Sequence, residues 1–358
     1  MLRQMSRARA GLALAAALAV AVALLIVTFG GGGSKRHGAA AAAAAQPYGP
    51  PALARYSEAS PHVASVLRWY GVQGGVQGAP PTPPPSLPPL QASTFRGPVA
   101  EYRAFSVRQL GAMETQVSRL QGALAAGDRA GAQRAWRAAF ANYRTLGAVY
   151  LEGDVATLNA AIDGNPGGLR GGTSSPKFTG LHRIEFGLWT GAPLASLQPF
   201  ARRLATDVAK MRRLLPRVQI AAIDYATRAH EILEDAVRDL LSGTDVPWSG
   251  EGVLGTNAGV AATSEIVKTL APLLQNREGV LPVVRSELAR LRLTLTALTA
   301  AHGGIVPTNS QLTQEQSERL NASIGQALEA LAQIPGALET SKPPATPAIP
   351  KTAERTDP

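Results

Sequence analysis

The apolar residues between 281 and 302 follow one another at alternating intervals of three and four. They are Leu281, Val284, Leu288, Leu291, Leu295 and Leu298, with His302 at the next step. Residues at this spacing lie on one face of an α-helix, and such a face is stable only when another helix covers it. Helical spacing continues almost throughout residues 97–335, without strand-like alternation of useful length. The sequence therefore predicts an all-α domain over residues 97–335, an antiparallel helical bundle.

Start and stop signals place some of the expected helices. Asp128 precedes an apolar stripe and is expected to cap that helix, while Thr313 and Gln316 have capping-box spacing. We expect one long helix over residues 218–241. His302 stands at a helix end, which favours a capping or partly buried histidine over a metal ligand.

Residues 11–30, GLALAAALAVAVALLIVTFG, form an uncharged run that is long enough to cross a bilayer. The basic segment 1–10 precedes it, so the positive-inside rule favours a cytoplasmic N-terminus. The competing interpretation is a cleaved signal peptide, whose apolar region is usually about 7 to 15 residues long. We expect an uncleaved transmembrane anchor. The protein would then be a single-pass protein of the cell membrane, with its folded domain on the extracytoplasmic side.

Low-complexity segments flank the predicted bundle. Residues 31–96 are rich in Gly, Ala and Pro, and prolines prevent regular backbone hydrogen bonding, so we expect a spacer. Residues 336–358 are rich in Pro, Thr and Lys and are expected to be a disordered tail.

Charge and composition exclude several classes of protein. The net charge is +10, but the arginines are scattered along amphipathic segments and aromatic residues make up only 5% of the chain. Nucleic-acid binding needs clustered charge and stacking surfaces, so we do not expect a nucleic-acid partner. The chain has no cysteine, which excludes disulfides, thiolate metal sites and cysteine nucleophiles.

The segment 178–189, FTGLHRIEFGLW, contains the pair with the clearest chemistry. His182 and Glu185 are three residues apart, so a helix would present both side chains on one face. An imidazole and a carboxylate one turn apart form half of the sites with which helix bundles bind iron and manganese. The alternative is an ordinary helical side-chain pair without a metal.

Carboxylates elsewhere could complete such a site. Glu231 and Glu234 lie at the edges of the apolar face of the predicted helix 218–241, and either could lean toward His182. The alternative is an exposed acidic face that pairs with nearby arginines. Three further carboxylates, Glu152, Asp154 and Asp163, lie close to the motif in the sequence, although Asp163 precedes a glycine and fits a turn. A mixed set of histidine and carboxylates suits iron, manganese or zinc.

Motifs for catalysis are missing from the sequence. A metallopeptidase helix usually carries His-Glu-x-x-His, whereas Arg183 follows His182 here and Phe186 stands where the second imidazole would be. There is also no nucleophile elbow, P-loop or dinucleotide fingerprint. We therefore expect no enzyme activity, with a metallopeptidase that uses Glu185 as its base as an alternative.

Four sequence blocks together resemble the EfeO/imelysin-like family, over roughly residues 97–335. They are AWRAAFANYRTLGAVY (135–150), FTGLHRIEFGLW (178–189), RAHEILEDAVRDLL (228–241) and LGTN (254–257). The resemblance implies an all-helical extracytoplasmic protein of an iron-uptake system, with an iron permease and a haem peroxidase-like protein as partners. The chain resembles the short form of the family, which lacks a cupredoxin-like domain.

By position, the resemblance implies that His182 and Glu185 are the metal motif, with Glu231 or Glu234 as a further ligand. This chain departs from the family pattern at two positions. Arg144 and Asn159 stand where the resemblance implies carboxylates. A positive charge at Arg144 would weaken the site, shift it or abolish it.

These observations predict a membrane-anchored metal-binding protein that captures iron, or another divalent or trivalent metal, through His182, Glu185, Glu231 and Glu234. Because ligands must lose protons, its metal affinity should rise toward neutral pH, and protonation of His182 should release the metal below about pH 6. The second hypothesis is a metal-independent cell-envelope module that binds a polyanion or polysaccharide through its basic surface.

Overall fold

A computed structural model describes residues 90–149, 153–277 and 279–338, and these residues form helices joined by turns and loops. All of these helices belong to one unit of the chain, residues 82–358. The predicted all-α fold is confirmed for this part of the protein.

Several predicted segments lie outside the described residues. They are the basic segment 1–10, the anchor 11–30, nearly all of the spacer 31–96 and most of the tail 336–358. Among the helices that the structure does describe, none is both long and apolar enough to cross a membrane. The transmembrane anchor therefore stays a prediction.

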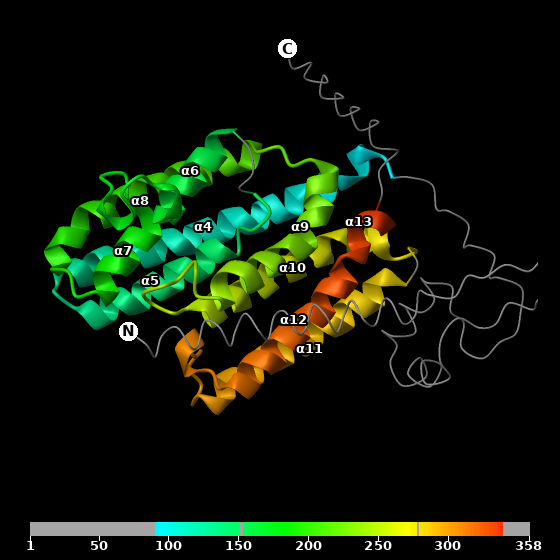
Figure 1. The fold of residues 1–358 in the computed structure, drawn as a ribbon. Helices are drawn as coiled ribbons and strands as arrows, with labels where there is room; N and C mark the ends of the chain where they lie inside the picture. Colours follow the sequence, from blue (N-terminus) through cyan, green and yellow to red (C-terminus); the bar gives the residue numbers. More distant parts are fainter. Residues whose placement is uncertain (1–89, 150–152, 278, 339–358) are drawn as a thin grey trace, which may run out of the picture. The chain divides into compact units, whose positions relative to one another are not determined.

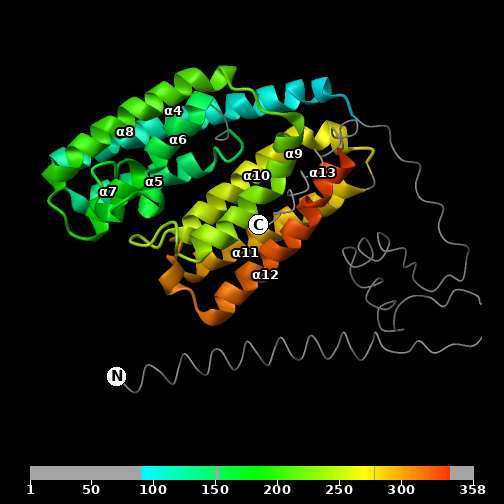
Figure 2. The same cartoon turned by 45° about the horizontal axis from the view of Figure 1, so that its top comes forward.

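The first group of helices lies together in Figures 1 and 2. It contains α4 (Arg96–Ala125), α5 (Arg129–Arg144), α6 (Gly153–Asp163), α7 (Gly180–Trp189) and α8 (Leu194–Leu214). Helix α4 packs against α5 and α8, and α7 packs against α8 and α5. The rings of Trp136 and Phe140 stack in the core with centroids 4.9 Å apart. Asp128 caps α5 as predicted, because its carboxylate accepts a hydrogen bond from the Gly131 amide.

The second group contains the C-terminal helices (Figure 1). They are α9 (Ala222–Asp235), α10 (Gly252–Leu274), α11 (Val280–Ala301), α12 (Gln314–Leu331) and α13 (Gln333–Ala337). The predicted apolar face of α11 is buried and packs against α12 and α10, which confirms the helix-packing prediction. His302 is the C-cap of α11 and is partly buried, and Thr313 and Gln316 form the predicted capping box.

The predicted long helix over residues 218–241 ends at Leu241 as expected, but it begins later and its last turns are π-helical. Val218 has an extended backbone with ψ 130°, so helix α9 begins only at Ala222. The last six residues, Ala236–Leu241, form a π-helix, η5. Short π-helical stretches inside helices are rare and often occur at functional sites.

Helix α10 connects the two groups because it packs against α4 and α5 as well as α9 and α11. A helix that is apolar on nearly all sides is stable only in the interior, and small residues let neighbours approach closely. A Cβ on Gly255 would lie 2.9 Å from Leu240 and 3.2 Å from Phe140, and one on Gly259 would lie 3.2 Å from Ile232. These glycines bring α5, α9 and η5 close to α10.

A candidate metal centre around His182

Helix α7 carries His182 into the interior of the protein. The side chain of His182 is 1% exposed and that of Glu185 is fully buried. Leu181, Ile184 and Leu188 of the same helix are buried in the core, so α7 is anchored on both sides of the histidine. The predicted arrangement of His182 and Glu185 on one helix face is observed.

Glu185 holds the imidazole ring in one orientation. Its Oε2 atom lies 2.9 Å from Nδ1 of His182. Its Oε1 atom accepts hydrogen bonds from the Ser249 amide at 2.8 Å and the Ser249 hydroxyl at 2.7 Å. Because a carboxylate oxygen accepts hydrogen bonds, the proton of this contact lies on Nδ1, which donates the hydrogen bond to Glu185. Glu185 therefore acts on the ring of His182, and both of its own oxygens are engaged.

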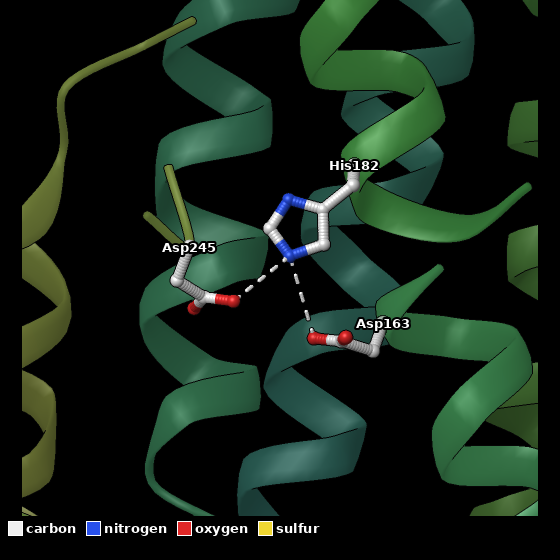
Figure 3. A group of neighbouring side chains, drawn as sticks. All are labelled: Asp163, His182 and Asp245. Atoms are coloured by element: carbon white, nitrogen blue, oxygen red, sulfur yellow. Dashed lines mark ion pairs between the residues drawn. The ribbon is translucent and has the colours of Figure 1, made fainter. Parts of the chain in front are cut away.

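The other ring nitrogen faces two carboxylates from distant parts of the chain. His182 Nε2 lies 3.5 Å from Oδ1 of Asp163 and 3.4 Å from Oδ1 of Asp245 (Figure 3). Nε2 is buried, and no described residue forms a hydrogen bond of good geometry with it. Asp163, His182 and Asp245 are the one group of three potential metal ligands within 4.8 Å in the part of the chain that the structure describes.

Two glycines explain how Asp163 reaches His182. Gly164, which follows Asp163, has φ +74°, and Gly180, at the start of α7, has φ +69°. A Cβ on Gly164 would lie 1.8 Å from the Thr179 carbonyl oxygen, and one on Gly180 would lie 2.5 Å from the Ile162 carbonyl oxygen. Only glycine fits this contact, so the end of α6 and the start of α7 can touch. Asp163 is thus next to a turn, as predicted, and also faces His182.

The positions at which the chain departs from the family pattern lie beside the same cluster. Arg144 donates a hydrogen bond of 3.3 Å to Oδ2 of Asp245, the oxygen other than the one nearest His182. Asn159 accepts a hydrogen bond of 2.7 Å from the Tyr143 hydroxyl. Arg144 therefore does not displace Asp245 from His182. Instead, the two basic groups share one carboxylate.

The cluster favours a positive charge at His182. Burial lowers the pKa of the imidazole, but Asp163, Asp245 and Glu185 outweigh burial and raise the pKa well above its ordinary value of 6.5. Burial likewise raises the pKa of Asp245, while His182 and Arg144 outweigh it and lower the pKa below its ordinary value. Three carboxylates face one imidazolium and one guanidinium here. The surroundings of Nε2 therefore attract a cation, whether a proton or a metal ion.

The donor set fits a metal ion in geometry as well as in charge. In an octahedral site, a metal–donor distance of about 2.1 Å places neighbouring donors about 3 Å apart. The distances from Nε2 to the two carboxylate oxygens exceed this by about half an ångström, which small side-chain movements can close. One imidazole and two carboxylates, without thiolates, suit iron, manganese or zinc. The hydrogen bond from Nδ1 to Glu185 is the usual support of a metal-bound histidine.

The other predicted ligands are not brought to His182. Oε2 of Glu231 lies 2.9 Å from Nη1 of Arg228, and Oε1 of Glu234 lies 3.8 Å from Nε2 of His230. Both glutamates are more than a third exposed, and each has its partner on its own helix. The alternative of an exposed acidic face describes them better. Glu152 and the side chain of Asp154 lie outside the described residues.

The sequence analysis missed Asp245 and Ser249. Both lie in the loop between η5 and α10, 63 and 67 residues after His182. The sequence shows only an aspartate and a serine between two helical segments, and nothing nearby indicates which distant side chain either of them meets.

The described part of the chain is thus an all-helical domain with a candidate transition-metal site of one histidine and two carboxylates. Residues 98–246 match the family model described as Imelysin, and this range contains Asp163, His182 and Asp245. Over this range the predicted resemblance to the EfeO/imelysin-like family is confirmed.

Two curated relatives are each named "Iron uptake system component EfeO". One is from Yersinia pseudotuberculosis serotype I (strain IP32953) and the other from Escherichia coli (strain K12). Each is 23% identical to this chain over 244 residues, which is 68% of this chain. The match spans 64% of the length of each relative.

Proposed function

We propose that the protein binds a transition-metal ion, iron in its biological setting, through His182, Asp163 and Asp245. The observation that carries this proposal is the buried Nε2 atom of His182, which has no hydrogen-bond partner among the described residues and faces two carboxylates. Glu185 is the positioning residue that keeps Nδ1 protonated and Nε2 directed at the ion. The metal is cargo here, so the protein needs no reaction of its own.

Iron and an uptake role are supported by the names of the relatives. We infer that the protein captures iron on the extracytoplasmic side of the membrane, anchored by residues 11–30, and passes it on within an uptake system. An iron permease and a haem peroxidase-like protein are the proposed partners. The anchor and these partners rest on the sequence pattern and the family resemblance.

Peptide hydrolysis is less well supported. The peptidase hypothesis requires Glu185 to activate a water molecule as a general base. Glu185 is fully buried, and both of its oxygens already accept hydrogen bonds. A group in that environment does not reach a substrate, so binding is the better account.

Metal titration of full-length variants tests the proposal. Removing a ligand by His182→Ala or Asp245→Asn should weaken binding of Mn²⁺ at least 10-fold, because a metal ion in a three-donor site loses one of its donors. Glu231→Gln and Glu234→Gln are the matched controls, since they change the predicted carboxylates that lie elsewhere. Unchanged affinity in the first pair and lost affinity in the second would move the site to helix α9.

A further inference from the structure

A cavity of about 180 Å³ adjoins the metal cluster, where a single water needs only about 10 to 15 Å³. Asp163 and Asp245 line the cavity, so a metal ion bound to them would face it. Arg144, Arg228 and Arg238 line the same cavity. The π-helix η5 contributes Arg238 to this wall.

Three protein donors leave the coordination of iron or manganese incomplete, because these ions commonly take six ligands. Glu185 closes the other side of His182, so the open positions face the cavity. Water could fill them, but the charges of the wall favour another class of ligand.

The charge of the wall changes when the metal binds. Three arginines and four aspartates of the described residues line the cavity. If Asp163 and Asp245 coordinate the ion, Arg228 and Arg238 keep their ion pairs with Asp235 and Asp239, while Arg144 shares its partner Asp245 with the ion. Two carboxylates neutralise only part of the charge of a trivalent ion. The space that remains in the cavity therefore has a positive electrostatic potential. A small anion there would be attracted by both the ion and the arginines.

Arg144 is in the best position to hold such an anion. Its guanidinium contacts Oδ2 of Asp245, while Oδ1 of the same carboxylate faces His182. Only the Asp245 carboxylate therefore separates the guanidinium from the metal position, and the side chain of Arg144 is only 19% exposed. A planar guanidinium presents several donors and suits a carboxylate or phosphate bound to the ion. For a bare cation the same charge would be unfavourable.

We propose that the cargo is a metal ion carried together with a small oxyanion, a chelating carboxylate or a phosphate, which occupies the cavity and binds Arg144. The anion completes the coordination of the ion on the side that the protein leaves open. This inference rests on the proposed function, because it assigns the anion to the same metal site.

The test is equilibrium dialysis of the full-length protein with Fe³⁺ and isotopically labelled anion, and with Mn²⁺ alone. Separate arms use citrate, carbonate and phosphate. We expect the wild type to retain about one anion per bound iron in at least one arm. Arg144→Gln should hold the anion about 10- to 100-fold more weakly, the loss expected for a hydrogen bond to a charged group. The arm with Mn²⁺ alone measures the metal affinity of this variant separately from anion binding.

Two further variants serve as controls. Arg144→Lys keeps the charge without the planar donor pair and should fall between the wild type and Arg144→Gln. Arg134→Gln removes an equal charge from an exposed residue outside the cavity and should change neither metal nor anion binding. Circular dichroism checks that each variant is folded.

The outcomes separate the two proposals. Metal retained without any anion in the wild type would overturn the oxyanion inference and leave the metal site standing. Anion retention that is equal in Arg144→Gln and the wild type would also overturn it. If the wild type binds neither Fe³⁺ nor Mn²⁺ in any arm, the proposed function fails and this inference fails with it.

Discussion

The Nδ1 atom of His182 lies 2.9 Å from Oε2 of Glu185, and this contact decides which ring nitrogen faces the cluster. Because Glu185 accepts the hydrogen bond from Nδ1–H, Nε2 is the ring nitrogen that faces Asp163 and Asp245. The helical pair recognised in the sequence therefore consists of one proposed ligand and one positioning residue.

The first prediction concerns this positioning role. Glu185→Gln places an amide group among donors from His182 and Ser249, so one donor must face another donor. Metal affinity should fall about 10- to 100-fold, the usual effect of changing a group that orients a ligand. Calorimetric titration with Mn²⁺ measures it. Glu318→Gln on the surface of α12 is the control, and an unchanged affinity in Glu185→Gln would exclude the positioning role.

The second prediction concerns the pH dependence of metal binding. The pKa of His182 lies well above 6.5 in the metal-free protein, so a metal ion must displace a proton from Nε2 even at neutral pH. Mn²⁺ affinity should therefore continue to rise with pH above 6.5, and release on acidification should begin at a higher pH than the value near 6 that an ordinary histidine predicts. Titrations in buffers with different ionisation enthalpies count the released protons. A plateau in affinity above pH 6.5 would contradict this.

The third prediction concerns the stability of the metal-free protein. The folded-state pKa of His182 is raised above its unfolded value, so the imidazolium stabilises the fold. This contribution is fully present below about pH 6.5 and is lost as the pH rises through the folded-state pKa. Urea unfolding with a chelator, between pH 6 and 9, should show the wild type losing stability relative to His182→Asn. If the free energies of unfolding of the two proteins change in parallel with pH, the raised pKa of His182 is refuted.

The fourth prediction concerns the contact between α6 and α7. Gly180→Ala forces a Cβ to within about 2.5 Å of a backbone carbonyl at a positive φ, so strain of at least about 1 to 3 kcal/mol is expected. The change should lower the melting temperature and weaken metal binding, because it moves His182 away from Asp163. Gly168→Ala, in the preceding loop, adds a methyl group in open space and is the control. Equal effects of the two substitutions would remove the role given to this contact.

Features of the fold and the site that lie within a single helix could be predicted from the sequence. Apolar spacing identified the α11 face, and capping signals at Asp128 and Thr313 marked helix starts that the structure contains. The spacing of His182 and Glu185 predicted that they share a helix face, and they are in contact. These features depend only on the geometry of a single helix.

Contacts of the site between residues far apart in the sequence could not be predicted. Glu231 was an expected ligand because it borders an apolar face, but Arg228, three residues earlier, already forms an ion pair with it. Asp245 lies in a loop whose path depends on the packing of η5 and α10, which no local pattern encodes. Sequence spacing identifies partners on one element, whereas this donor set combines residues from three separate segments.

The most direct test is anomalous X-ray diffraction from crystals of the protein soaked with Mn²⁺. We predict one strong anomalous peak within about 2.0 to 2.3 Å of Nε2 of His182 and of carboxylate oxygens of Asp163 and Asp245, with Glu185 hydrogen-bonded to Nδ1. A peak beside Glu231 or Glu234, with no peak beside His182, would contradict a metal site at His182, Asp163 and Asp245.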